Sequence, residues 1–211
     1  MQGVLLVYSS NRNLPPEFVD SLQASIFAGA GVSKWEGASD VTLARNISLS
    51  KACEVLLQHP RFEVVLMVDD DMVWKVEQAK QLTEHCRNTK RPCSGCYVMK
   101  DGRMAAHHDG KMWQVGLGFV AIPRQLLLDL YVTSRRFTGA NGDPVREFTR
   151  SGVEGEWKGE WKGEDFWLTR RMGGVDLLPI GVGHIKPLVL YPQPETLAAF
   201  IAKHSVPSPK G

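Results

Sequence analysis

The clearest pattern in the chain is the unbroken apolar run Val64 to Val68, which ends at three consecutive acids, Asp69, Asp70 and Asp71. Five apolar residues in a row, three of them valine, are typical of a strand that is buried on both faces, such as a central strand of a parallel sheet. The acids therefore follow the carboxyl end of this strand. Open α/β sheets bind their ligands at that edge.

The rest of the pattern alternates predicted strands with predicted helices. We expect strands at 4–8, 94–99, 115–122 and 175–182, and helices at 16–27, 42–58, 75–86, after Pro123, 164–172 and 194–204. The first half of the chain then runs strand, helix, helix, strand, helix, which predicts an α/β fold with a parallel sheet. Region 138–163 is rich in glycine, charge and tryptophan and contains a tandem Gly-Glu-Trp-Lys repeat, so it is interpreted as a mobile surface loop.

Three adjacent carboxylates repel one another unless a cation or hydrogen-bond donors compensate them. Because side chains alternate along a strand, Asp69 and Asp71 are expected to point one way and Asp70 the other. An acidic, oxygen-rich site suits Mg²⁺ or Mn²⁺, which bridge carboxylates to substrate phosphates. The alternative is a solvated acidic turn or a helix cap. The position after a buried strand favours metal and phosphate binding.

Two further groups of residues follow predicted element ends. Glu164 and Asp165 lie in the first turn of a predicted helix, where the dipole favours acids, and either could also serve as a general base. His184 and Lys186 come directly after a predicted strand. The imidazole could complete a metal shell and the lysine could neutralise phosphate charge, although a lone histidine is more often structural.

A last group could face the crevice beside the first strand, where a nucleotide would bind. It comprises Ser9 and Ser10 at the end of that strand and Arg45 near the start of the second helix. Each of these residues is a weak signal when taken singly.

The composition suits one soluble domain. The 211 residues are 43% hydrophobic, and the net charge of +2 is too small to indicate nucleic acid by itself. No run of about 20 apolar residues exists, and the N-terminus is interpreted as a strand rather than a signal peptide. We therefore expect a cytoplasmic protein with reduced thiols.

Cys93 and Cys96 form a C-x-x-C pair that could bind zinc, but buried thiols are the favoured interpretation because no second pair appears.

Taken in order, the motifs resemble those of nucleotide-sugar glycosyltransferases of the GT-A fold, in their inverting, family-two-like group. The matching segments are Ala44-Arg45-Asn46, Val68 to Met72, Val115 to Phe119, Gly163 to Phe166, and His184. The resemblance spans about residues 3–192. It implies one Rossmann-like α/β domain over 1–211, with a mostly parallel central sheet flanked by helices. A nucleotide-binding half would occupy about 1–100, an acceptor and catalytic half about 101–192, and a C-terminal helix and tail 193–211.

The resemblance also implies roles for individual residues. Asp71 and His184 would bind Mn²⁺ or Mg²⁺, and Asp69 would hold the ribose or a metal-bound water. Asp165 would be the general base, with Glu164 as the reserve candidate. The contacts to the donor, a nucleotide sugar and by family expectation a UDP-sugar, would come from Ser9, Ser10, Arg45, Asp69, Asp70 and Lys186.

The acceptor stays open at this point. A saccharide, a lipid-linked glycan and the hydroxymethylated bases of DNA are all compatible with the sequence. A DNA acceptor would make the protein a phage-type enzyme of the host cytoplasm. The paired arginines at 135–136 and 170–171 would then contact the phosphates of the DNA backbone. A nucleotidyltransferase is disfavoured because segment 9–14 has no glycine for a phosphate loop. A sugar- or nucleic-acid-binding module would leave the acids and His184 unexplained.

Overall fold

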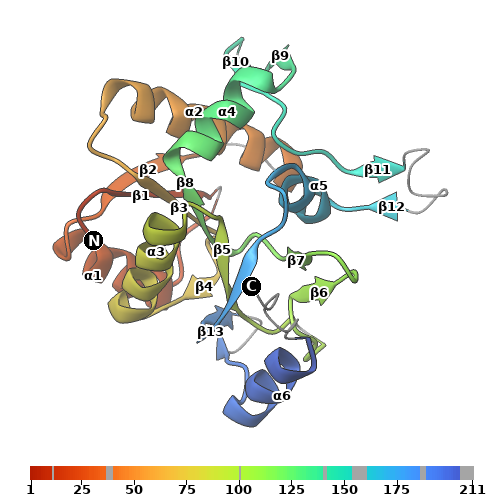
Figure 1. Cartoon of the computed structure of the whole chain (residues 1–211). Coiled ribbons are helices and arrows are strands. Elements are labelled where there is room, and N and C mark those ends of the chain that lie inside the picture. The colour runs from red at the N-terminus through yellow and green to blue at the C-terminus, as the bar shows by residue number, and fades with distance from the viewer. Residues whose placement is uncertain are drawn as a thin grey trace.

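A six-stranded mixed sheet forms the centre of the molecule in the computed structural model (Figure 1). The structure describes residues 1–10, 12–36, 40–99, 101–139, 142–153, 161–185 and 189–204. The strand order is β13 (Asp176–Gly181), β5 (Cys93–Cys96), β8 (Phe119–Pro123), β3 (Val64–Val68), β1 (Val4–Ser9), β2 (Gly31–Trp35). Strand β1 is parallel to β2 and β3, and β13 is parallel to β5, whereas β8 is antiparallel to both of its neighbours. The predicted α/β class with a mostly parallel sheet is confirmed.

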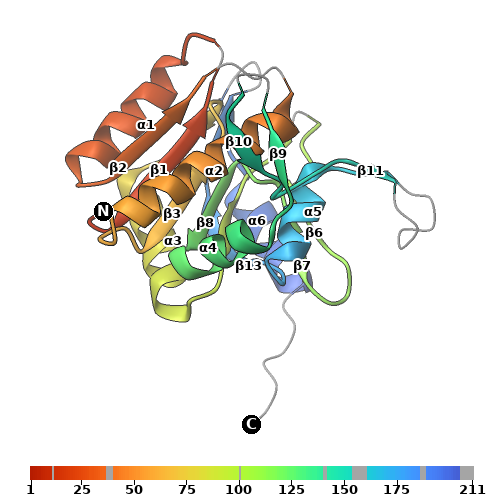
Figure 2. The same ribbon diagram turned by 90° about the horizontal axis from the view of Figure 1, so that it is seen from above.

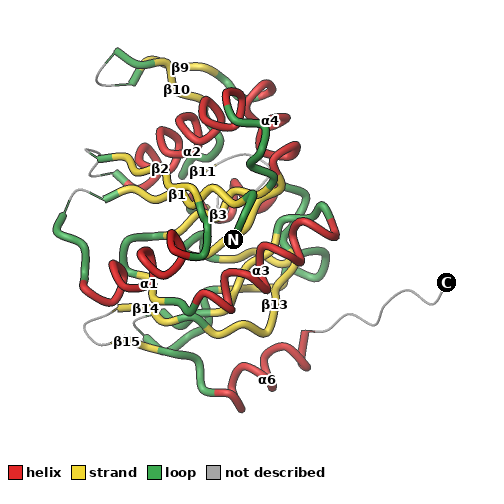
Figure 3. Tube along the Cα trace, turned by 90° about the vertical axis from the view of Figure 1, so that its left-hand side faces the viewer, coloured by secondary structure: helices red, strands yellow, loops and turns green. Residues whose placement is uncertain are grey.

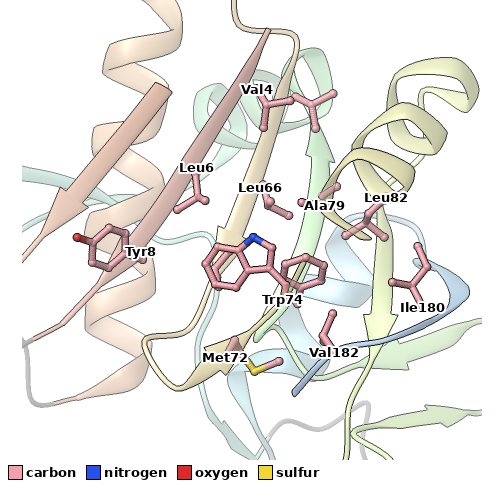
Figure 4. Close-up of a cluster of buried hydrophobic side chains, with 14 of the residues drawn as sticks. Val4, Leu6, Tyr8, Leu66, Met72, Trp74, Ala79, Leu82, Ile180 and Val182 are labelled. Carbon is pink, nitrogen blue, oxygen red and sulfur yellow. The ribbon is translucent and has the colours of Figure 1, made fainter. Parts of the chain in front are cut away.

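Helices cover both faces of this sheet because the residues of β1 alternate between two buried clusters. Val4 and Leu6 pack with α1 (Pro16–Phe27) and α3 (Val76–Thr89), as Figure 4 shows. Leu5 and Val7 pack on the other side with α2 (Val41–Gln58), α4 (Arg124–Thr133) and α5 (Glu164–Arg171). The last helix, α6 (Pro194–His204), lies at the end of the molecule opposite α4 (Figures 1 and 3).

Smaller sheets surround the carboxyl edge. One joins β4 (Met72–Val73), β14 (Gly183–Ile185) and β15 (Val189–Leu190); the others are the pairs β6 (Ala106–His108) with β7 (Trp113–Val115), β9 (Arg136–Thr138) with β10 (Pro144–Arg146), and β11 (Gly152–Val153) with β12 (Trp161–Lys162). The β11–β12 pair extends away from the rest of the molecule (Figures 1 and 2). Within the described residues, no helix combines the length and apolar character needed to cross a membrane.

The sequence interpretation was wrong in three places. Segment 31–35 is the strand β2, so the order is strand, helix, strand, helix, strand; as an edge strand it is only partly buried and has no apolar run to signal it. The strand expected at 115–122 is divided between β7 and β8 by a turn at 116–118. Region 138–163 contributes to two short hairpins. Residues 154–160, with Trp157 and most of the tandem repeat, lie outside the described residues.

The turn between β7 and β8 explains the two glycines at 116 and 118. The backbone passes directly over the buried ring of Tyr97, whose Oη accepts a hydrogen bond from the N–H of Gly118 at 3.1 Å. A Cβ atom at Gly116 would lie 2.1 Å from this Oη, and one at Gly118 would lie 3.0 Å from it and 3.1 Å from Sδ of Met72. Glycine is therefore required at 116 by close packing, and 118 is nearly as tight.

This packing predicts that Gly116→Ala lowers the free energy of unfolding by about 1–3 kcal/mol, as overpacking of a well-packed core does. Urea unfolding measures the loss. Gly163→Ala is the matched control, because its Cβ would meet nothing within 4 Å, and we expect it to cost less than about 1 kcal/mol.

The same clash can be tested by a double-mutant cycle. In a Tyr97→Phe background the 2.1 Å contact with Oη is gone and a 3.0 Å contact with Cζ remains, so the Gly116→Ala loss should shrink. An equal loss in both backgrounds would contradict this account of the turn.

Candidate functional site

Arg45 lies near the start of α2, and its buried guanidinium contacts three carboxylates from two other segments. Nη2 donates to both oxygens of Asp69, at 2.9 and 3.2 Å. Nη1 donates to Oδ1 of Asp165 at 2.5 Å and to Oε1 of Glu164. The structure thus brings Asp69, the first acid after β3, and the two acids that begin α5 together around one cation.

Asn46, the next residue, holds the segment that leads toward α5. Its Nδ2 donates to the carbonyl of Thr149 at 2.8 Å, and its Oδ1 accepts from the backbone N–H groups of Phe148 at 2.8 Å and Thr149 at 3.0 Å. The hydroxyl of Thr149 then donates to the carbonyl oxygen of Glu164. The Arg-Asn pair therefore has two tasks, because the arginine binds the acids and the asparagine fixes the backbone that carries two of them.

The charges of this cluster shift two pKa values. Burial disfavours the charge of Arg45, but Asp69, Asp165 and Glu164 outweigh it, so the pKa of Arg45 is raised. Withdrawal from water raises the pKa of Asp165 to about 6, and the charges of Glu164 and Asp69 add to this rise while Arg45 and the N–H of Leu117 oppose it. A carboxylate with such a pKa can accept a proton near neutral pH.

Asp70 and Asp71 contact other residues. Asp70 accepts from the hydroxyl of Ser10 at 2.7 Å and from Nε and Nη2 of Arg12 at 3.1 and 2.6 Å. Asp71 lies 4.0 Å from Nη2 of Arg12. The predicted alternation of the three aspartates does not hold, because β3 ends at Val68 and a turn follows in which the N–H of Met72 donates to the carbonyl of Asp69 at 3.2 Å.

Asp71 and His184 form the best candidate for a metal site. Strand β14 pairs with β4 so that His184 lies opposite Met72, which places Nε2 of the histidine 3.4 Å from Oδ2 of Asp71. Nδ1 lies 2.8 Å from the carbonyl oxygen of Val98, and because a carbonyl only accepts, the proton is assigned to Nδ1. A histidine whose second nitrogen is held in this way is typical of metal ligands.

The donor set fits a divalent cation that takes its remaining ligands from phosphate and water. A carboxylate and an imidazole suit Mn²⁺ well and Mg²⁺ less well, and Mg²⁺ in particular is bound through few protein ligands plus substrate oxygens. Among the described residues, no group of three or more His, Cys, Asp or Glu side chains could hold a metal ion. A metal here would therefore be held by Asp71 and His184 together with the substrate.

Other predicted site residues are less closely tied to the cluster. Ser9 ends β1 and pairs with Trp35 in the strand register, and Lys186 lies outside the described residues. The thiols of Cys93 and Cys96 are buried, as predicted, and donate to the carbonyls of Leu82 and Leu178.

Sequence reasoning missed Arg12 and Tyr97. Arg12 could have been found as the cation of the polar loop after the first strand. Tyr97 gave no signal, although its ring packs edge-on against His184 with the centroids 5.3 Å apart.

Comparison with protein-family models and with curated proteins finds no match. Among solved structures, the chain is similar in fold to A197 from STIV, with a TM-score of 0.60 at 16% identity over 92% of this chain and 91% of that one. Two more distant similarities are 4-diphosphocytidyl-2C-methyl-D-erythritol synthase from Anaerococcus prevotii (TM-score 0.45, 11% identity, 83% and 86% covered) and a glycosyltransferase involved in glycosylation of the major capsid of PBCV-1 (TM-score 0.36, 9% identity, 60% and 62% covered). The similarity to A197 from STIV is one of fold, and it agrees with the predicted α/β class.

The acid cluster predicts that Arg45→Met destabilises the protein strongly and in a pH-dependent way. Removing one partner of a buried ion pair typically costs about 3–5 kcal/mol, and since Asp69 and Asp165 are 36% and 41% exposed we expect the lower end. The acids left without their cation take up protons as pH falls, so the loss should be smaller at pH 5 than at pH 8.

Urea unfolding at the two pH values measures this difference. Arg103→Met is the matched control, because its ion pair with Asp101 is exposed to solvent and should contribute little to stability at either pH. A loss for Arg45→Met that is small, or equal at both pH values, would contradict the proposed cluster.

Proposed function

We propose that this protein is a metal-dependent glycosyltransferase that moves a sugar from a nucleoside-diphosphate sugar, with UDP as the expected nucleotide, to an acceptor hydroxyl. The observation that carries the proposal is the contact of Arg45 with Asp69 on one side and with Asp165 on the other. It joins Asp69, an acid suited to a donor, with a carboxylate suited to a general base, at the carboxyl edge of an α/β sheet, where such sheets bind their ligands.

The donor would bind across the ends of β1 and β3. Asp71 and His184 would hold the divalent cation, which when bound supplies positive charge to the diphosphate leaving group. Asp69 would receive the ribose or a metal-bound water, and Ser9 and Lys186 would contact the donor. Ser10 and Arg12 keep Asp70 fixed beside Asp71, so in this proposal Ser10, Arg12 and Asp70 order the donor site.

The acceptor hydroxyl would be deprotonated by Asp165. As its oxygen bonds to the anomeric carbon of the sugar, the bond to the diphosphate breaks and the proton passes to the carboxylate. Asp165 is favoured over Glu164 for this role because Asp165 lines a cavity in which an acceptor could bind, whereas Glu164 does not line it. Arg45 would hold the base in position, and Glu164 would help to keep its pKa raised.

The proposal predicts that nucleotide-sugar binding depends on a divalent metal and on Asp71. A panel of nucleotide sugars is titrated calorimetrically with Mn²⁺ or with chelator. We expect one donor to bind with Mn²⁺, and chelator or Asp71→Asn to weaken its binding at least about 10-fold, as loss of a metal ligand or its support does. Asp129→Asn, on the exposed face of α4, is the control and should bind like the wild type.

Slow metal-dependent release of nucleoside diphosphate from the same donor would support transfer chemistry over mere binding. Donor binding that is unchanged in chelator and in Asp71→Asn would contradict the metal site. A panel in which no donor binds would contradict the proposed function itself.

The raised pKa of Asp165 predicts the pH dependence of transfer. Because the base must be ionised to accept a proton, kcat/KM should rise with pH and level off above an apparent pKa of about 6. Asp165→Asn should lower kcat by about 10²–10⁴-fold while donor binding persists. If Glu164→Gln rather than Asp165→Asn removed the pH dependence, the assignment of the base would be wrong.

A further inference from the structure

A cavity of about 810 Å³ opens beside Asp165. Residues from the β6–β7 hairpin, from the start of α5 and from α6 line it together with segment 102–105. A volume of this size accommodates a drug-sized ligand, and cavities that bind such ligands are mostly apolar with a few placed polar groups.

The walls of this cavity are mainly apolar. The larger apolar side chains that line it are Met99, Met104, Val115, Phe166 and Phe200. Methionine side chains adapt to the shape of a ligand, and phenylalanine rings offer a large rigid apolar surface to aliphatic and aromatic groups.

Among the described lining residues, those that can carry charge are Arg103, His107 and Asp165. Arg103 is exposed and paired with Asp101, and His107 is also exposed. Asp165 is held at the cavity by its ion pair with Arg45. The cavity therefore offers a ligand apolar walls with a carboxylate at one point.

We propose that the acceptor carries its reacting hydroxyl beside an apolar group, aliphatic or aromatic, that occupies this cavity. The inference rests on the proposed function, because it places the acceptor oxygen at Asp165. That oxygen would lose its proton to the carboxylate and gain the sugar, while the nucleoside diphosphate leaves. A free hydrophilic sugar would bury little of the apolar surface that Met104 and Phe200 present to the cavity.

The arginines that the sequence suggested for the phosphates of DNA lie outside this cavity. The arginine pairs at 135–136 and 170–171 do not line the cavity. Arg135 and Arg171 line a separate cavity of about 160 Å³ together with Glu147, Thr149 and Trp167. A phosphate backbone bound by Arg135 and Arg171 would therefore lie outside the cavity that Asp165 lines.

Two glycosides that differ in their alkyl group test the proposal. Octyl glucoside, used below its micelle concentration, and methyl glucoside present the same sugar hydroxyls. We expect the full-length wild-type protein to bind the octyl compound at least about 10-fold more tightly, and kcat/KM with the metal-bound donor to show the same preference, because apolar pockets discriminate by about 10–200-fold for small apolar differences.

Substitutions in the cavity wall then test whether the preference for the octyl compound arises in this cavity. Met104→Glu places a charge in the wall and should reduce the octyl preference to below about 3-fold. Met99→Glu does the same at a more exposed position, so that a folded variant is available even if Met104→Glu fails to fold. Val132→Glu is the control, because it makes the same kind of change on the exposed face of α4 and should keep the wild-type ratio.

Several results would overturn the proposal. One is equal binding and transfer for both glycosides, which would leave the glycosyltransferase function standing. Another is an octyl preference that persists in both cavity variants. Transfer to DNA with hydroxymethylated bases in preference to octyl glucoside would replace it with a nucleic-acid acceptor. Octyl binding without transfer from any metal-bound donor would overturn the proposed function and the acceptor assignment together.

Discussion

The rest of the site depends on the ion pairs that the guanidinium of Arg45 forms with three carboxylates. The guanidinium holds Asp69, Glu164 and Asp165 at one point, although the two acids of α5 are more than a hundred residues away along the chain. One positive charge cannot balance three carboxylates, so the cluster retains negative charge. Burial raises the pKa of Asp165, and the charges of Glu164 and Asp69 add to this rise. A divalent cation bound near Asp71 would add positive charge on the donor side of this cluster.

A second constraint is the close packing around Tyr97. The ring supports the turn at Gly116 and Gly118 on one side and lies against His184 on the other. The carbonyl of Val98, the residue after Tyr97, orients the imidazole. The same short segment therefore positions the backbone before β8 and the histidine that faces Asp71. Rigid support of this kind is what a metal and phosphate site requires.

The sequence predicts local features of this molecule well. The buried strand Val64–Val68 was evident from its apolar run, and the acids that follow it lie at the sheet edge as expected. The helix that begins at Glu164 was also predicted, and the two acids of its first turn agree with the dipole of a helix start. The direction of the three aspartates was not predictable, since the alternation rule ends where β3 turns.

Long-range features were beyond the sequence. The contacts of Arg45 join segments whose pairing depends on the strand order, and nothing local indicates that β8 is antiparallel. Strand β2 gave no signal because an edge strand is buried only in part. The residue types of the site could thus be predicted, whereas their arrangement around one arginine could not.

The measurement that tests this account most directly is a ¹³C NMR titration of the aspartate carboxyl carbons in the wild type and in Asp69→Asn. If Asp69 and Asp165 share one electrostatic site, Asp165 titrates near pH 6 in the wild type, and removal of the charge at Asp69 lowers its pKa. Comparison with Asp165→Asn identifies the resonance. A pKa close to the ordinary aspartate value of about 3.9, unchanged by Asp69→Asn, would contradict the coupled site.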